Sequence, residues 1–285
     1  MKRIIITIAI ILFHLNAFAG GGWVQPKGMG YYKLSQWWIV ADAHYTSTGE
    51  VDPNGTRATY FTSVFAEYGV TDRITGVVYW PFFGRSLVYE QVSGTTGEVI
   101  TPGDAINGIG DMDLTVKYGL TKDTRIALSA SLLLGLPLGE SSGGRDGTLQ
   151  TGDGEFNQMI QLDAGTSFNV FGLYPYVNAY AAFNNRTNGF SDEFRWGAEV
   201  GLSYKFLYAN VRIQNVTSLK NGDSNFNTAG TSLFANNMEF LAITPEVGII
   251  INDSWGVMAN YGTAEYGRLI FANPTYSVGI FYKPK

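Results

Sequence analysis

The feature that most limits how this chain can fold is a set of six segments in which apolar and polar residues alternate. Such alternation gives a β-strand one apolar face and one polar face, because successive side chains point to opposite sides. Five of the segments end at an aromatic residue beside a short connection: Tyr68, Tyr118, Phe168, Tyr204 and Tyr282. An apolar exterior, a polar interior and a belt of aromatic residues at one level are typical of a transmembrane β-barrel. We therefore expect these five residues to form an aromatic girdle at the periplasmic side.

The first residues have the three parts of a secretory signal peptide: a basic start, an apolar stretch and a small-x-small cleavage site that ends at Ala19. The apolar stretch is shorter than the about 20 residues that a transmembrane helix needs. We expect cleavage after Ala19. The expected division of the chain is a signal peptide at residues 1–19, a short periplasmic N-terminal segment at 20–28, too short to plug a lumen, and a barrel at 29–285.

The pattern predicts twelve strands joined by connections that alternate in length. The strands are expected at residues 29–41, 59–68, 73–83, 110–118, 125–137, 156–168, 174–184, 194–204, 207–217, 238–251, 255–262 and 275–282. Short periplasmic turns opposite long extracellular loops are characteristic of barrels in bacterial outer membranes. The sequence therefore predicts an all-β protein, a 12-stranded antiparallel transmembrane β-barrel with short periplasmic turns and long extracellular loops, in the outer membrane of a Gram-negative bacterium.

The composition agrees with this fold and excludes several kinds of partner. Charged residues make up 15% of the chain, below the about 25% that is usual in soluble domains. The net charge is −5 and there is no basic cluster, so we expect no nucleic-acid partner. The chain has no cysteine, which excludes disulfides and thiolate metal sites.

The charged residues of the strands are expected to point into the barrel, because a charge on the lipid side costs about 2–4 kcal/mol near the midplane. The predicted pore-lining residues are Asp111, Asp113, Lys117, Asp163, Arg195, Glu199, Arg212, Gln214 and Glu246. Strands 73–83 and 174–184 are apolar on both faces. Their candidates for the inner face are Tyr176, Tyr180 and either Tyr79 or Trp80.

Two interpretations of this interior remain open. The charges of both signs can form ion pairs that fill and brace the barrel, since buried charges are usually paired. Alternatively, some of them line a narrow permeation path. Eight strands give a filled interior and sixteen or more give a wide pore, so twelve strands fit both interpretations.

The residues give little support for catalysis or metal binding. A hydrolytic triad needs a histidine base, and His44 is the one histidine outside the expected signal peptide. Asp111 and Asp113 lie on one face, but the six to eight oxygen ligands of calcium are not supplied. The glycines around Gly110 lack the helix that follows a nucleotide-binding loop. We expect no catalytic residue, no metal and no cofactor.

Two long connections contain apolar residues and leave their role open. The start of residues 84–109 is unusually apolar, with Phe82 and Phe83 just before it and Leu87, Val88 and Tyr89 within it. This connection folds into the barrel mouth as a constriction, presents a patch for hydrophobic ligands, or continues the flanking strands as a hairpin above the membrane. In the connection at residues 263–274, Arg268 is a candidate contact for lipid headgroups or lipopolysaccharide.

Three segments resemble a family of outer-membrane transporters named for the meta-pathway of phenol degradation. Residues 108–118 match a Gly-x-Gly-Asp start and a strand that ends in Lys-Tyr, residues 136–139 match Leu-Pro-x-Gly, and residues 151–156 match Thr-Gly-Asp-Gly. The similarity covers roughly residues 59–205 and the C-terminal strand. The resemblance implies a monomeric or weakly associated barrel for uptake of small hydrophobic or aromatic compounds.

The expected function is a passive outer-membrane channel or transporter for a small-molecule solute, and not an enzyme. Its other partners would be outer-membrane lipids and lipopolysaccharide, and its oligomeric state stays open. The alternative is a structural or adhesive barrel with a closed, ion-paired lumen whose loops bind a partner.

Overall fold

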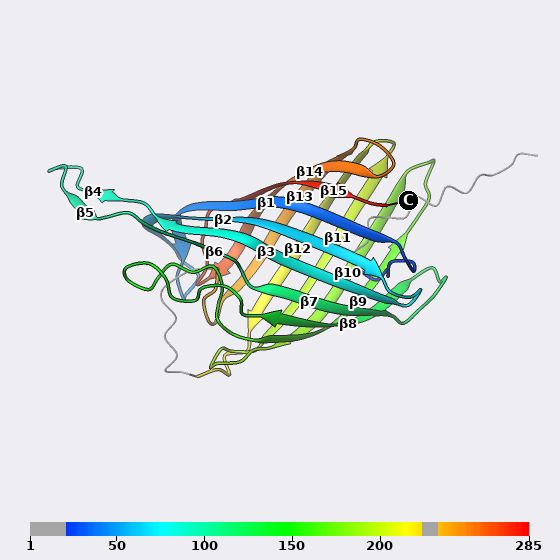
Figure 1. The fold of residues 1–285 in the computed structure, drawn as a ribbon, viewed down its shortest axis with the longest axis horizontal. Coiled ribbons are helices and arrows are strands. Elements are labelled where there is room, and N and C mark those ends of the chain that lie inside the picture. The colour runs from blue at the N-terminus through cyan, green and yellow to red at the C-terminus, as the bar shows by residue number, and fades with distance from the viewer. Residues whose placement is uncertain (1–20, 224–232, 285) are drawn as a thin grey trace, which may run out of the picture.

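The computed structural model describes residues 21–223 and 233–284, and these residues form one closed antiparallel β-barrel (Figure 1). Twelve strands make the wall. They are β1 (Gly30–Tyr45), β2 (Val51–Gly69), β3 (Ile74–Val88), β7 (Met112–Gly119), β8 (Ala127–Leu136), β9 (Asn157–Ser167), β10 (Tyr174–Asn185), β11 (Glu193–Tyr204), β12 (Leu207–Ser218), β13 (Glu239–Ile250), β14 (Trp255–Arg268) and β15 (Thr275–Tyr282). Pairing of β15 with β1 closes the barrel. In the described ranges, no helix is long and apolar enough to cross a membrane.

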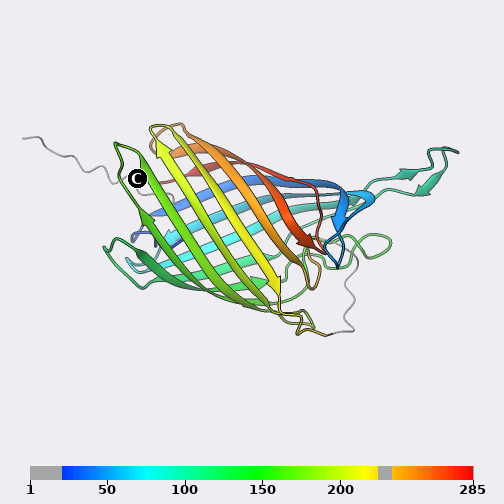
Figure 2. The ribbon, with the colours of Figure 1, turned by 180° about the vertical axis from the view of Figure 1, so that it is seen from behind.

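The strands of the wall are steeply tilted, as the view from behind shows for β10 to β13 (Figure 2). The predicted fold is confirmed, and at the periplasmic ends the expected strands agree with the observed ones within a few residues. At the extracellular ends β1, β2, β3 and β14 are longer than expected by several residues. β1 and β2 continue to pair as far as Tyr45 and Val51, inside the expected loop 42–58. A paired strand above the membrane can be polar on both faces, so its composition resembles that of a loop.

The longest connection, residues 84–109, is a hairpin that extends the wall. β3 continues to Val88 and pairs there with β6 (Asp104–Gly108). Beyond them, β4 (Gln91–Val92) and β5 (Val99–Thr101) form a small hairpin that projects away from the barrel (Figure 1). Of the open alternatives for this connection, the structure shows the hairpin and not a constriction of the mouth.

The wall separates an apolar outer face from a polar inner face. Val116, Ile160 and Leu162 are 59–62% exposed on the outer face. Leu114 and Val200 also face outward, because their neighbours Thr115 and Glu199 line the interior. The inner face has one small hydrophobic cluster of Tyr208, Met258 and Phe281 near the periplasmic end, so most of the interior is polar.

Candidate functional site in the barrel lumen

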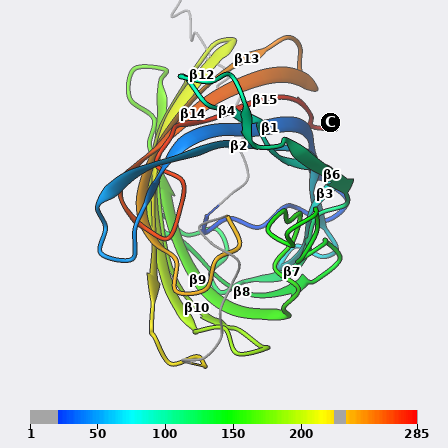
Figure 3. The same cartoon turned by 90° about the vertical axis from the view of Figure 1, so that its left-hand side faces the viewer.

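The N-terminal segment lies inside the periplasmic end of the barrel (Figure 3). The Lys117 ammonium donates to the carbonyl oxygen of Gly21 at 3.0 Å, and the backbone N–H of Gln25 donates to Thr75 Oγ1 at 2.8 Å. The Gln25 side-chain amide donates to a Glu67 carboxylate oxygen at 2.9 Å. We expected residues 20–28 to be a short periplasmic segment, too short to plug a lumen, but the described part, from Gly21 onward, lies inside the barrel. An extended chain covers about 3.3–3.6 Å per residue, so even a short segment reaches far along the inner wall.

A cavity of about 490 Å³ adjoins this segment in the middle of the barrel. Six of the predicted pore-lining residues line it: Asp113, Asp163, Glu199, Arg212, Gln214 and Glu246. Five tyrosines line it as well: Tyr31, Tyr79, Tyr176, Tyr180 and Tyr208. The structure thus selects Tyr79 rather than Trp80 for the inner face of β3. The lining combines carboxylates, amides, phenol hydroxyls and aromatic rings.

Three of these tyrosines lie across a glycine of the neighbouring strand. Tyr176 is paired with Gly201, Tyr180 with Gly197 and Tyr208 with Gly248. A Cβ atom added to any of these glycines would lie 2.0–2.4 Å from the tyrosine ring. The rings therefore lie close against the wall, in space that only glycine leaves free.

Part of the cavity is held by a cross-strand ion pair. Glu199 and Arg212 are directly opposite each other on β11 and β12, and the Arg212 Nε donates to Glu199 Oε2 at 2.9 Å. The Tyr176 hydroxyl donates to the other oxygen of Glu199 at 2.7 Å. Glu246 on β13 accepts hydrogen bonds from the Tyr208 hydroxyl and the Asn260 amide, at 3.1 and 3.3 Å. Glu199 thus has a cationic partner, whereas the hydrogen-bond donors to Glu246 are neutral.

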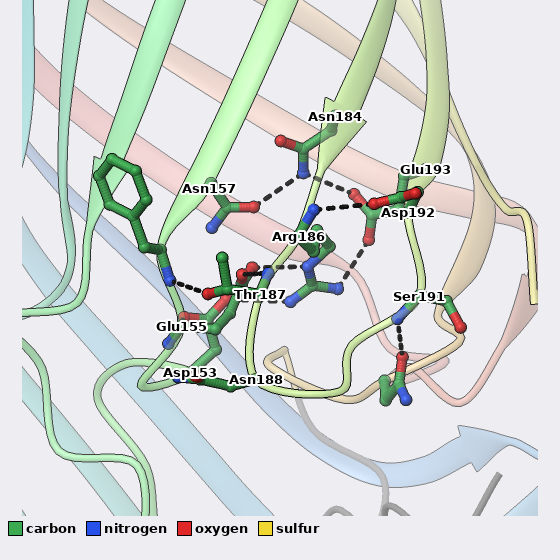
Figure 4. A network of polar contacts seen from close by, with 12 residues as sticks. Asp153, Glu155, Asn157, Asn184, Arg186, Thr187, Asn188, Ser191, Asp192 and Glu193 are labelled. Atoms are coloured by element: carbon green, nitrogen blue, oxygen red, sulfur yellow. Dashed lines mark hydrogen bonds and ion pairs between the residues drawn. The ribbon is translucent and has the colours of Figure 1, made fainter. Parts of the chain in front are cut away.

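At the extracellular mouth, several polar residues surround one buried arginine; we call them the Arg186 network (Figure 4). The Arg186 guanidinium donates to Glu155 at 2.6 Å, to Glu193 at 2.9 Å and to Asp153 at 3.0 Å. The Arg186 side chain is 5% exposed, and those of Glu155 and Glu193 are 0% and 1% exposed. The Asn184 amide also donates to Glu193, at 3.2 Å. The network joins the segments next to β9, β10 and β11 at the mouth.

Two predicted pore-lining residues belong to this mouth and do not line the mid-lumen cavity. Arg195 donates to Glu193, and Asp111 accepts from the backbone N–H groups of Gly139 and Asp153, each at 2.8 Å. Sequence reasoning missed Arg186 and its partners, because all but Glu193 lie outside the observed strands. The sequence held one signal for this network: two expected loops each contain a pair of acidic residues, and one of these loops also contains Arg186.

The predicted girdle residues lie at the periplasmic ends of their strands. Tyr68, Tyr118, Phe168 and Tyr204 are 38–48% exposed. Tyr282 packs against Trp255, with 4.7 Å between ring centroids. Aromatic rings at one level are favourable where a membrane meets water.

No arrangement suited to a metal is found among the described residues: none of their His, Cys, Asp and Glu side chains form a group of three or more that could hold an ion. His44 lies near the extracellular end of β1, where its Nδ1 is 3.4 Å from the side-chain nitrogen of Asn54.

Comparison with known proteins identifies the fold. No protein-family model and no curated protein matches the chain. Among solved structures, the COG4313 outer membrane channel from Pseudomonas putida F1 is similar with a TM-score of 0.57 and 14% identity, over 94% of this chain and 98% of that chain. The β domain of the Bordetella autotransporter BrkA gives a TM-score of 0.49 and 11% identity, over 90% of this chain and 100% of that chain. The NanC porin gives a TM-score of 0.48 and 7% identity, over 89% of this chain and 100% of that chain.

The fold is therefore that of an outer-membrane β-barrel. A closed barrel with an apolar outer face satisfies every backbone group of its wall within the hydrocarbon region. Together with this fold, the apolar exterior places the protein in an outer membrane.

Proposed function

We propose that the protein is a passive outer-membrane channel for small solutes. The observation that carries this proposal is the cavity of about 490 Å³ that remains between the ion pairs of the lumen. A barrel whose interior served only for bracing would fill this space with side chains. The lining supplies charged, amide and hydroxyl groups that can replace the hydration shell of a solute, which is how a narrow pore selects what it passes.

The chemistry of the lining also bears on the kind of solute. Five tyrosine rings support the expectation of an aromatic or hydrophobic compound, because rings stack on apolar surfaces. The carboxylates and amides between them favour a solute that also forms hydrogen bonds. A small amphipathic molecule satisfies both parts of the lining.

A second candidate is an adhesive barrel, and one observation favours it. The hairpin of β4 and β5 carries Val92, Val99 and Ile100 beyond the barrel, and these residues are 49%, 52% and 67% exposed. Apolar residues that gather on an extracellular hairpin suit contact with another macromolecule. In this case the lumen would stay shut.

Conductance across a planar lipid bilayer separates the two functions. A channel gives stepwise conductance, and Asp113→Asn, which neutralises a cavity carboxylate, should change the step size. Glu98→Gln on the exposed hairpin is the matched control and should leave the step unchanged. A folded barrel that gives no steps, and from which no small molecule co-purifies, would reject the channel in favour of the adhesive barrel.

A further inference from the structure

Three buried side-chain oxygens of the cavity lining lack hydrogen-bond partners among the described residues. They are Asp163 Oδ2, Asn178 Oδ1 and Asn210 Oδ1. Their residues are 4%, 7% and 7% exposed. The orientation of Asn210 is set by its amide nitrogen, which lies 3.5 Å from a Glu246 oxygen. A buried polar group without a partner costs about 1–3 kcal/mol. Because all three atoms are acceptors, the group that would satisfy them is a donor.

The charge of the lining points to a cationic donor. Two cations line the cavity, Lys33 and Arg212, and Arg212 is already paired with Glu199. The Lys33 ammonium lies 5.7 Å from the centre of the Phe65 ring. The carboxylates that line the cavity are Glu67, Asp113, Asp163, Glu199 and Glu246. The lining therefore has an excess of carboxylates over cations.

Four of these five carboxylates have no Lys, Arg or His nitrogen within 4.0 Å in the described parts of the chain. Asp163 accepts a hydrogen bond from the neutral amide of Gln161 at 2.8 Å, and its second oxygen stays unpartnered. Lys117 acts on Asp163 without contacting it within 4.0 Å. A buried carboxylate with no cation in contact either takes up a proton or binds a cation. The tyrosine rings of the lining add attraction for a cation through their π faces.

We propose that the lumen contains a binding site for an ammonium group, centred on Asp163 with Asn178 of the adjacent strand beside it. The solutes that this site selects are small organic ammonium ions, whose apolar part lies against the tyrosine rings. An ammonium group has donors and no acceptor, which matches the acceptors of Asp163 and Asn178 that have no partner among the described residues. A volume of about 490 Å³ suits a small molecule. This inference rests on the proposed channel function and names its substrate class.

The N-terminal segment lies directly beside this site. The Gly21 carbonyl oxygen accepts from Lys117 and from Ser129, the residue opposite Asp163. A Cβ atom added to Gly21 would lie 2.3 Å from Asn178 Oδ1. A solute therefore reaches the site either past this segment or only after the segment is removed.

Titration calorimetry in detergent with n-butylammonium, and with n-butanol and butyrate as neutral and anionic probes, tests the site. Full-length processed protein should bind n-butylammonium at least tenfold more tightly than the other two probes if solutes occupy the site. If the N-terminal segment covers the site, n-butylammonium should bind only after deletion of residues 21–27. In both cases Asp163→Asn should weaken binding about tenfold. Asp72→Asn, at a 63% exposed side chain in the β2–β3 turn, is the control and should not.

Bilayer measurements keep this inference separate from the channel proposal. Cation selectivity, read from the reversal potential in a salt gradient, should fall in Asp163→Asn while the stepwise conductance persists. Conductance without ammonium binding in either the full-length or the shortened protein would overturn the ammonium site and leave the channel standing. A protein without any conductance would reject the channel. The heat-dependent mobility of barrels in detergent gels confirms that each variant is folded.

Discussion

At the extracellular mouth, one arginine contacts three carboxylates, whereas in the mid-lumen cavity five carboxylates face two cations. Arg186 uses the edge and one face of its guanidinium group: the edge donates hydrogen bonds, and the face lies 4.2 Å from the centre of the Phe190 ring. In the cavity, by contrast, one oxygen of Asp163 has no partner among the described residues. Charges that hold a structure together are paired inside the chain, while charges left without a partner are available to a ligand. The contrast supports a bracing role for the mouth and agrees with the proposed role of the cavity in selection.

Removal of Arg186 should have the largest effect on stability. Arg186→Met leaves Glu155 and Glu193 buried without their shared cation, and breaking a buried ion pair in this way costs about 3–5 kcal/mol. The free energy of unfolding in denaturant, followed by tryptophan fluorescence, measures the loss. Arg145→Ala removes an arginine with a 59% exposed side chain and should cost less than about 1 kcal/mol. Equal losses in the two variants would contradict the bracing role.

Removal of the cavity arginine should have a smaller effect on stability and a larger one on selectivity. The side chains of Arg212 and Glu199 are 36% and 18% exposed, so water screens them more than the Arg186 network. Arg212→Gln should cost about 1–3 kcal/mol through the lost charged hydrogen bond. It also frees Glu199, so cation selectivity in the bilayer should increase. A shift of the reversal potential towards anions would show that the contrast between mouth and cavity is mistaken.

The smallest expected effect is a pH dependence at the rim of the mouth. Burial opposes ionisation of Asp192, yet hydrogen bonds from the Asn221 amide, the Arg186 backbone N–H and the Asn185 amide hold its pKa below the ordinary value. A lowered pKa means that this carboxylate stabilises the fold above about pH 4, its unfolded value, and that the contribution is lost as the pH falls through the folded value.

Limited proteolysis of the extracellular loops at pH 5 and pH 3 measures this contribution. Cleavage should increase at pH 3 in the unmodified protein, and Asp192→Asn should reduce the difference between the two pH values. Asp52→Asn, at another exposed carboxylate of the extracellular end, serves as the control. An unchanged difference in Asp192→Asn would show that the loops respond to acid through other groups.

The wall of this barrel could be predicted from sequence, and the reasons are physical. In the membrane, every second side chain must be apolar, so Leu114 and Val200 fix the register of their strands. Above the membrane this requirement ends, which is why the pairing of Tyr45 with Val51 was not predicted. The inner face of β3 depends on a register shift in its partner strand between Thr62 and Val64, which alternation alone cannot place.

The candidate site could be predicted only in part. Glu199 and Arg212 carry charges within clear strands, and the alternation sends them inward. Arg186 could not be assigned, because its contact with its partners depends on how two connections fold, the one before β9 and the one between β10 and β11. The position of the N-terminal segment could not be assigned either. Glycine has no side chain that would favour one face of the barrel wall. The path of the segment is set instead by hydrogen bonds with Lys117 and Thr75, which lie side by side only once the barrel has formed.

The glycines opposite the tyrosine rings determine how the width of the barrel lumen can change. Because Tyr176 lies across Gly201, a methyl group on that glycine would push the ring toward the barrel axis. The width left for a solute of the proposed channel therefore depends on glycines that lie behind the tyrosine rings. Tyr180 opposite Gly197 and Tyr208 opposite Gly248 repeat the arrangement. Replacement of any one of the three glycines by alanine would therefore narrow the lumen at a different position.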